Sequence, residues 1–441
     1  MLCSIPGAAA HFQWGILPSS FHIIHLLSQF VSSQTTSHST MLDLENTARL
    51  KSDVCKAFRS LSSFCCPRSM TPENDDYEPT ISTDQIYFLT SLLIDMRTAL
   101  LPSLRQCLND LVLLLHPSHF LQDPQANLRA SLEITSQLAD IMEKIRFAVC
   151  TVTLAQLDVF EFEDHLHGIA KSHRTQPLLH ELNMLMSHDL RVLFRKHVKF
   201  IQGWKSLKEE RDGTYSSQRR DMCPETKLTS DHINKIVQSL EKSDFGLIQA
   251  SWQAVVNSYD HGFADLIEYI IKSGSVTNSS IAPTTTRVET PRSRLRSLLQ
   301  AAIPFFKLGR IYLNKLSSNP ISRPPFTIQS QISSTELNCV KDKTYMFSLL
   351  LLHFNKTLVD LTHSYRLHNY QSSLKDKFEN ILKYFNASVE LFSRHSVPLV
   401  STNQLPLPQS NTMFKDHFSL LIDQFRLAAQ NFSMALERSR N

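Results

Sequence analysis

Residues 82–111 read STDQIYFLTSLLIDMRTALLPSLRQCLNDL, and this stretch decides the fold class. Its large apolar side chains recur at intervals of three or four residues, which is the spacing of a helix that turns one face toward a core. These side chains are Ile86, Leu89, Leu93, Met96, Leu100, Leu104, Leu108 and Leu111. Pro102 interrupts the pattern. A proline inside a helix removes a backbone hydrogen bond and clashes with the preceding turn, so we expect a kink or a split here.

Similar apolar spacing continues along most of the chain. It predicts further helices over 42–64, 124–149, 176–202, 231–272, 295–318, 335–365, 371–395 and 411–437. The chain has only 9 glycines in 441 residues, whereas about 7% is usual. Because glycine serves tight turns and phosphate-binding loops, this scarcity favours long helices with few turns. No alternating pattern long enough for a strand is present.

Prolines mark both starts and bends in these helices. Asp123 followed by Pro124 is a start signal, a capping residue and then a proline at the first helical position. Pro177 is expected to start a second helix in the same way, and Pro304 is expected to bend the apolar helix around it. The sequence therefore predicts an all-α protein, with long proline-kinked helices in one or two helical bundles and a disordered loop.

Composition divides the chain into segments. Residues 1–41 contain no Lys, Arg, Asp or Glu and are expected to be poorly ordered, and Met41 is an alternative start to Met1. We expect an N-terminal helical bundle over 42–204 and a polar linker over 205–228. A C-terminal bundle should cover 229–437, with a flexible Ser/Thr-rich loop over 273–292.

Charge and cysteine content exclude several classes of protein. The formal net charge is +4, and no run approaches the about 18 apolar residues of a membrane span. The eight cysteines form no CxxC pair and no regular spacing, which argues against a disulfide framework or a zinc site. The apolar stretch 21–31 lacks the basic residues that precede the core of a secretory signal. We therefore expect a cytoplasmic or nuclear protein.

Two short motifs resemble catalytic signatures. Residues 243–247, SDFGL, contain the triplet that holds magnesium in protein kinases, but no glycine-rich loop accompanies it. The alternative is that Ser243 caps a helix and places Asp244 in its first turn. Residues 180–184, HELNM, begin like a metalloprotease helix but carry Met184 where the second histidine is needed.

The most informative polar cluster is EFEDHLHGIAKSH, residues 161–173. On a helix, Glu161 would face His165, and Glu163 and Asp164 would face His167, which is a geometry that can hold a metal. A di-iron bundle needs a matching motif on a second helix, and the chain has none. Two interpretations follow: surface pairing of acids with imidazoles, or a metal-binding or enzymatic bundle. We assign no catalytic, cofactor-binding or metal residues and expect no cofactor.

Basic residues gather in two places. Arg191, Arg195 and Lys199 lie four residues apart on one predicted helix. A second group, Arg292, Arg294 and Arg296, offers a weak contact with an anionic lipid or phosphate surface. No nucleic-acid module surrounds either group, so we expect no specific nucleic-acid binding.

Three segments resemble an expanded family of helical proteins of rust fungi (Pucciniales). They are DHINKIVQSLEKSDFGLIQASWQ (231–253), AAIPFFKLGRIYLNKLSS (301–318) and FKDHFSLLIDQFRLAAQNFSMALE (414–437). The resemblance implies a soluble helical protein without an established activity. In architecture alone, the chain is also similar to cyclin-D1-binding and vinculin-type helical bundles. We therefore expect a non-catalytic interaction or scaffold protein that binds protein partners through a groove between helices.

Overall fold

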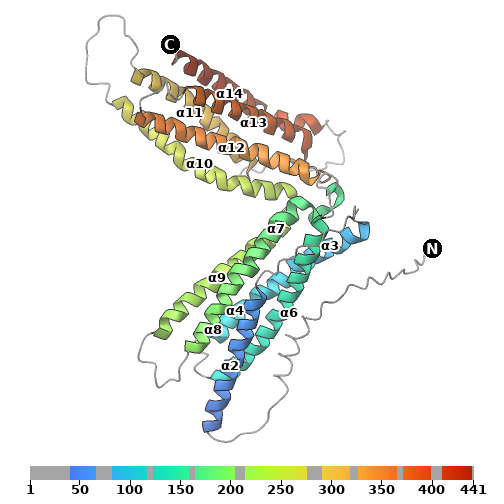
Figure 1. The fold of residues 1–441 in the computed structure, drawn as a ribbon. Coiled ribbons are helices and arrows are strands. Elements are labelled where there is room, and N and C mark those ends of the chain that lie inside the picture. Colours follow the sequence, from blue (N-terminus) through green and yellow to red (C-terminus); the bar gives the residue numbers. More distant parts are fainter. Residues whose placement is uncertain are drawn as a thin grey trace, which may run out of the picture. The chain divides into compact units, whose positions relative to one another are not determined.

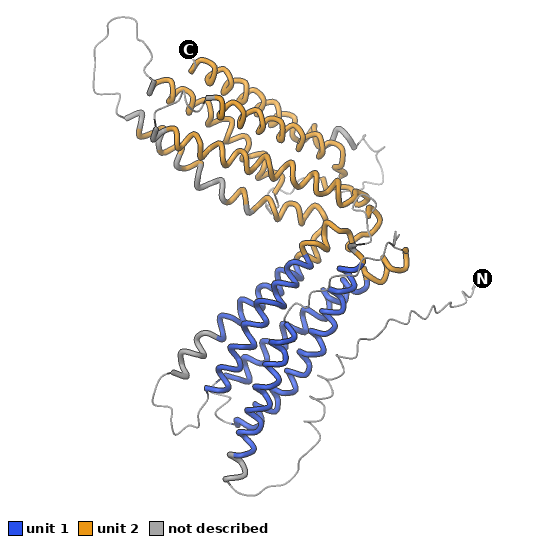
Figure 2. The backbone as a smooth tube through the Cα atoms, viewed as in Figure 1, with its two compact units in different colours: residues 1–77, 91–154, 178–238 blue, residues 78–90, 155–177, 239–441 orange. Residues whose placement is uncertain are grey.

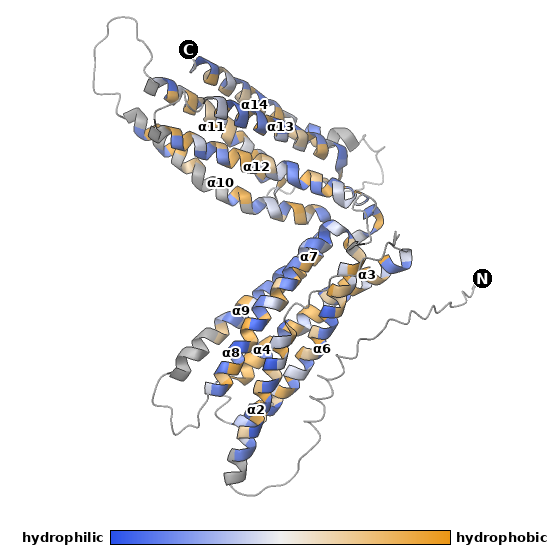
Figure 3. Ribbon diagram, in the orientation of Figure 1, coloured by the Kyte–Doolittle hydropathy of each residue, from blue (hydrophilic) through white to orange (hydrophobic). Residues whose placement is uncertain are grey.

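The computed structural model describes residues 40–65, 82–116, 123–157, 164–203, 214–275, 291–317, 326–364, 371–398 and 410–439. The fold is all-α, as the apolar spacing predicted, with one short two-stranded ladder added to the helices (Figure 1). Hydrophobic and hydrophilic residues are interspersed along the helices (Figure 3), as expected of amphipathic helices. Among the described helices, none combines the length and the apolar character needed to cross a membrane.

The chain forms two compact units (Figure 2). Unit 1 consists of residues 1–77, 91–154 and 178–238, and unit 2 of residues 78–90, 155–177 and 239–441. This division differs from the predicted one. Residues 214–228, expected as part of the linker 205–228, instead form the first half of helix α9 (Thr214–Glu241). The rest of the expected linker, 205–213, lies outside the described residues. The segment 155–177, expected in the N-terminal bundle, belongs to unit 2.

Unit 1 is built from helices that also include short π-helical turns. Besides α9 they are α2 (Thr40–Phe64), α3 (Thr83–Asp95), η1 (Met96–Leu100), α4 (Leu101–Leu114), α6 (Pro124–Leu157), α7 (Ser172–Met184), η4 (Leu185–Leu190) and α8 (Arg191–Gly203). The first residues of α3 and α7 and the last of α6 and α9 are assigned to unit 2. The predicted start of α6 is confirmed, because the Ala126 amide donates to the carboxylate of Asp123 at 3.0 Å.

Helices α2 and α8 pack against each other in the core of unit 1. The ring of Phe58 on α2 lies 6.0 Å from that of Phe194 and stacks on the imidazole of His197 at 5.0 Å. His197 is fully buried, and its Nδ1 donates to the Leu193 carbonyl at 2.9 Å. Burial lowers the pKa of His197 to about 4, since the charged ring would lose its hydration. His197 is therefore a neutral core residue.

Pro102 neither breaks nor splits its helix. The chain turns from α3 through the π-helical turn η1 directly into α4, and Pro102 lies in the first turn of α4. The Leu101 amide donates to the Met96 carbonyl, five residues back. A π turn holds one extra residue, so it absorbs the missing hydrogen bond of the proline without interrupting the buried apolar stripe.

Unit 2 contains five long helices, together with two short 3₁₀ turns and the strand ladder. They are α10 (Asp244–Ser275), α11 (Pro291–Leu316), α12 (Ser334–Ser364), α13 (Gln371–His395), α14 (Ser410–Arg438), η2 (Asp164–Leu166), η3 (Gly168–Ala170), β1 (Phe326–Ile328) and β2 (Ser396–Pro398). Helix α12 packs on α13 and α10, α11 on α14 and α10, and α13 on α14.

The core of unit 2 is rich in aromatic rings. Phe305 of α11 lies 4.8 Å from Phe425 of α14, and Phe425 lies 4.1 Å from Phe385 of α13. Helix α11 approaches closely at Gly309, where an added Cβ would come within 2.7 Å of a methyl group of Leu351 on α12. Phe425 of α14 lies 3.5 Å from the same position, so α11, α12 and α14 meet where α11 has no side chain.

Helix α11 also continues through Pro304, and the bend expected there stays a prediction. Pro304 is exposed, and so is Gln300, whose carbonyl loses its intrahelical partner four residues later. Water can satisfy that carbonyl, while the neighbouring Phe305 and Phe306 remain fully buried. The proline therefore lies on the side of the helix where it costs least.

The structure differs from the predictions in one strand ladder and at several segment boundaries. The ladder pairs Phe326 with Pro398 and Ile328 with Ser396 in antiparallel register, and the sequence did not predict it. Helix α7 starts at Ser172, so Pro177 lies inside it rather than at its start. Thr40 and Met41 are helical, whereas residues 1–39 lie outside the described residues. Of the expected loop 273–292, both ends are helical and the remainder, 276–290, also lies outside them.

Candidate functional site

The acid–histidine cluster does not assemble as a metal site in the part that the structure describes. Residues 161–163 lie outside it, Asp164 is fully buried, and His165 is exposed. Burial lowers the pKa of half-buried His167, which favours its neutral form. Within the described residues, no group of three or more His, Cys, Asp or Glu side chains is arranged to hold a metal ion.

Asp164 instead caps two helices at once. Its Oδ2 accepts a hydrogen bond from the Ser172 amide at 2.9 Å, at the start of α7. Its Oδ1 accepts from the Ser334 amide at 2.7 Å, at the start of α12, and the Ser334 hydroxyl also donates to Oδ2. The first amides of a helix have no partner within the helix, and a carboxylate there also faces the positive end of the dipole. One buried carboxylate therefore satisfies two helix starts.

Lys171 is buried beside this cap, with 1% of its side chain exposed. Its ammonium donates to the carboxylate of Asp244 at 3.1 Å and to the carbonyls of Ser330 at 2.7 Å and Ile332 at 2.8 Å. An ammonium has three N–H donors, and each has an acceptor here. The charge is thus paired and fully hydrogen-bonded, which buried ions require.

Arg174 completes the arrangement from the first turn of α7. Its guanidinium donates to the other carboxylate oxygen of Asp244 at 2.8 Å. It also donates to the carbonyls of Lys242 at 2.8 Å and Leu240 at 3.3 Å, at the end of α9. A cation is favoured at the negative end of a helix. Asp164, Lys171, Arg174 and Asp244 form what we call the polar staple, and their charged groups are held by structural contacts.

The capping interpretation of SDFGL is confirmed. The hydroxyl of Ser243 accepts from the Gly246 amide at 3.1 Å, and Asp244 lies in the first turn of α10. Asp244 is held by Lys171 and Arg174, so the triplet serves the polar staple. Next to it, burial lowers the pKa of His173, whose Nδ1 contacts the Asn338 amide oxygen at 3.1 Å.

A histidine that the sequence did not single out bridges two helices in unit 1. The Nδ1 of His232 on α9 lies 2.5 Å from the Asp189 carboxylate, and its Nε2 lies 2.8 Å from that of Glu181. A carboxylate only accepts, so both contacts form together when each ring nitrogen carries a proton. Glu181 is the glutamate of HELNM, but its partner is 51 residues away along the chain, and no local signal reveals such a pair.

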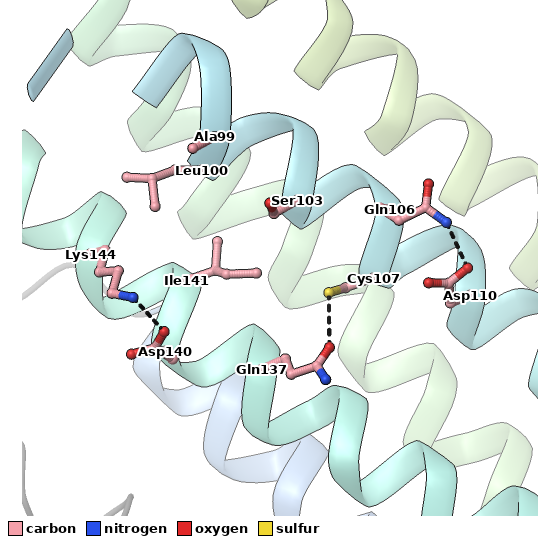
Figure 4. Close-up of a pocket in the computed structure, with 10 residues that line it drawn as sticks. All are labelled: Ala99, Leu100, Ser103, Gln106, Cys107, Asp110, Gln137, Asp140, Ile141 and Lys144. Atoms are coloured by element: carbon pink, nitrogen blue, oxygen red, sulfur yellow. Dashed lines mark hydrogen bonds and ion pairs between the residues drawn. The ribbon is translucent and has the colours of Figure 1, made fainter. Parts of the chain in front are cut away.

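A groove lies between α4 and α6 in unit 1, with a volume of about 520 Å³ (Figure 4). Helix α4 and the π turn η1 contribute Ala99, Leu100, Ser103, Gln106, Cys107 and Asp110, and α6 contributes Gln137, Asp140, Ile141 and Lys144. Its apolar part consists of Ala99, Leu100 and Ile141. Polar pairs flank it: Gln106 donates to Asp110 at 2.8 Å, and Lys144 to Asp140 at 2.7 Å.

The thiol in this groove is not activated. Burial raises the pKa of Cys107, which keeps it protonated at neutral pH. Its Sγ lies 3.7 Å from the Gln137 amide oxygen, and a weak hydrogen bond of this kind occupies the thiol proton. The arrangement suits binding of a polar and apolar surface better than nucleophilic attack.

The predicted basic groups lie on separate helices. Arg294 and Arg296 are half-buried on α11, and the side chain of Arg292 lies outside the described ones. On α8, Arg195 and Lys199 are exposed, whereas Arg191 is half-buried.

Comparison with known families finds two matches. Residues 89–241 are similar to a domain of unknown function (DUF8723), and residues 243–434 to a second domain of unknown function (DUF8721). No curated protein and no solved structure matches the chain. The two matched segments meet at residues 241–243, close to the point where unit 1 gives way to unit 2 near residue 238.

Proposed function

We propose that this chain is a non-catalytic interaction protein that binds a segment of a partner protein in the groove between α4 and α6. The observation that carries the proposal is the composition of that groove. An apolar centre at Leu100 and Ile141 is flanked by polar pairs on both helices. Protein-binding sites combine an apolar centre with a polar rim in this way.

The local backbone supports this assignment. Ala99 and Leu100 belong to the π turn η1, and π turns occur frequently at functional sites. Leu100, the last residue of this turn, and Ser103 in the helix that follows both line the groove.

The charges of the groove indicate the chemistry of the partner segment. Asp110 and Asp140 provide carboxylates, and Lys144 provides one ammonium, which is already paired with Asp140. We expect an apolar side chain of the partner to enter between Leu100 and Ile141. Next to it, a basic or amide group of the partner should donate a hydrogen bond to the carboxylate of Asp110. Exposed ion pairs contribute little energy, so the apolar anchor should dominate the affinity.

A photo-crosslinking amino acid at Ser103 tests the proposal, because Ser103 lines the groove and is exposed. The same amino acid at Leu113, exposed on α4 but outside the groove lining, is the control. We expect one protein to crosslink through position 103 and not through position 113. Its binding should then be measured with both purified proteins.

Two substitutions complete the test. Ser103→Trp fills the groove and should weaken binding of the purified partner at least about tenfold, since the anchor loses its site. Ser103→Ala leaves the groove open and should bind like the wild type. Equal binding by Ser103→Trp, or equal crosslinking at both positions, contradicts the proposal.

A further inference from the structure

Helix α14 presents large apolar side chains on the face opposite its core. Phe418, Phe425 and Phe432 are fully buried, whereas Leu420, Leu427 and Met434 are exposed by 70%, 57% and 47%. Leu427 follows Phe425 by two residues and so lies about 200° further around the helix. On the neighbouring α13, by contrast, each exposed residue is polar or charged. The outer face of α14 thus differs from that of α13 in carrying three large apolar side chains.

These three residues are spaced seven apart, which is the repeat of helices that pair along a seam. Along the same exposed face the sequence continues in both directions from Leu427, with intervals of four, three and four residues. The residues are Asp416, Leu420, Asp423, Leu427, Asn431, Met434 and Arg438, all exposed. The intervals are the same when counted from either end. The seam, as we call this row, is therefore symmetric about Leu427.

We propose that the seam binds a second copy of this chain, with the two α14 helices antiparallel and Leu427 on the two-fold axis. In that register Leu427 meets Leu427 of the other copy, and Leu420 meets Met434. Asp423 meets Asn431, and Asp416 meets Arg438. Each apolar residue faces an apolar one, and each terminal acid faces a base, which is the self-complementarity that a two-fold interface requires.

The charges distinguish this arrangement from the parallel one. In a parallel pair Asp416, Asp423 and Arg438 would each face their own copy, and like charges facing each other across a helix pair are unfavourable. The seam runs over 23 residues, from Asp416 to Arg438, or about 33 Å of helix axis, which makes a small contact. We therefore expect a reversible dimer with a dissociation constant on the order of 10 μM.

This surface lies on unit 2, whereas the groove between α4 and α6 lies on unit 1. The proposal therefore does not depend on the proposed function. Substitutions in the seam should leave crosslinking through Ser103 unchanged, and Ser103→Trp should leave self-association unchanged. Failure of one proposal leaves the other standing.

Sedimentation velocity of the full chain over a range of concentrations tests self-association. The wild type should shift from monomer to dimer, and Leu427→Asp should raise the dissociation constant at least about 100-fold, because two carboxylates would meet on the axis. Leu113→Asp is the matched control, since Leu113 is 62% exposed on α4, outside the seam. A wild type that remains monomeric up to about 500 μM overturns the proposal, as does a dimer that Leu427→Asp leaves intact.

Charge exchange then tests the register. Asp416→Arg alone and Arg438→Asp alone should each weaken the dimer, since each places like charges opposite one another. The double variant should restore it in the antiparallel arrangement, because each base again faces an acid. In a parallel dimer the double variant would still pair like charges. Absence of rescue therefore overturns the antiparallel register.

Discussion

Replacing Asp164 with alanine tests whether one buried carboxylate holds the starts of two helices. The change removes the acceptors of the Ser172 and Ser334 amides and of the Ser334 hydroxyl. Loss of an N-cap costs about 0.5–2 kcal/mol, and a buried donor left without a partner costs about 1–3 kcal/mol. With two helix starts affected, we expect the free energy of unfolding of unit 2 to fall by about 3–5 kcal/mol.

Two variants provide the scale for this value. Asp123→Ala removes an exposed N-cap from one helix, α6, and should cost about 1 kcal/mol. Asp164→Asn keeps one acceptor oxygen, so it should satisfy one amide and cost about half as much as alanine. The predicted order of destabilisation is therefore Asp164→Ala, then Asp164→Asn, then Asp123→Ala.

The assay combines urea unfolding, followed by far-ultraviolet circular dichroism, with hydrogen–deuterium exchange. Exchange is needed because a chain with two compact units does not have to unfold in one step. We expect faster exchange in the first turns of α7 and α12 of Asp164→Ala, and unchanged exchange in α6. If Asp164→Ala costs no more than Asp123→Ala, or if the first turns keep their protection, the reasoning is refuted.

Three further predictions concern the two cores. His197→Gln should reduce the pH dependence of stability. The pKa of His197 is about 4 in the folded chain and about 6.5 in the unfolded chain, so the unfolded chain binds the proton first as the pH falls. In urea unfolding, the wild type should therefore lose about 2 kcal/mol more of its free energy of unfolding than the variant between pH 7 and pH 5. Equal losses would contradict this. Gly309→Ala should lower the free energy of unfolding by about 1–2 kcal/mol in urea unfolding, because the new Cβ meets buried Leu351 and overpacking outweighs the gain in helix propensity; a stabilised variant would show that Leu351 moves aside. Tyr312→Phe should cost about 1–2 kcal/mol in the same assay, since the buried hydroxyl contacts Ser388 at 2.9 Å, and burial raises the Tyr312 pKa; no loss would show that Thr344, 2.7 Å from the Ser388 hydroxyl, is a sufficient partner for Ser388.

Apolar spacing and capping chemistry are local, and they predicted what depends on them. The stripe from Ile86 to Leu111 predicted a helix, and Asp123 and Ser243 cap the helices that they were expected to cap. The helices continue through Pro102 and Pro304, because a π turn precedes the first proline and solvent faces the second. Such accommodation depends on the surroundings, which spacing alone does not describe.

The features that the sequence did not predict depend on distant partners. Asp164 belongs to a motif that suggested metal binding, but its carboxylate is used by Ser334, which is 170 residues away. His232 and Asp189 are 43 residues apart, and the ladder joins strands of only three residues. No pattern within one helix length signals these contacts, so the sequence predicted the helices well and the polar contacts between them poorly.

The polar staple has a practical consequence for dividing the chain. A fragment that begins at residue 243, where the second family match begins, would include Asp244 and Ser334 but would lack Asp164, Lys171 and Arg174. Asp244 would lose both of its cations, and the Ser334 amide at the start of α12 would lose its Asp164 acceptor, although the Ser333–Glu336 pair would remain. Adding a separate peptide that spans 155–177, one of the two segments of unit 2 drawn from the first half of the chain, should supply those groups and restore these contacts in trans.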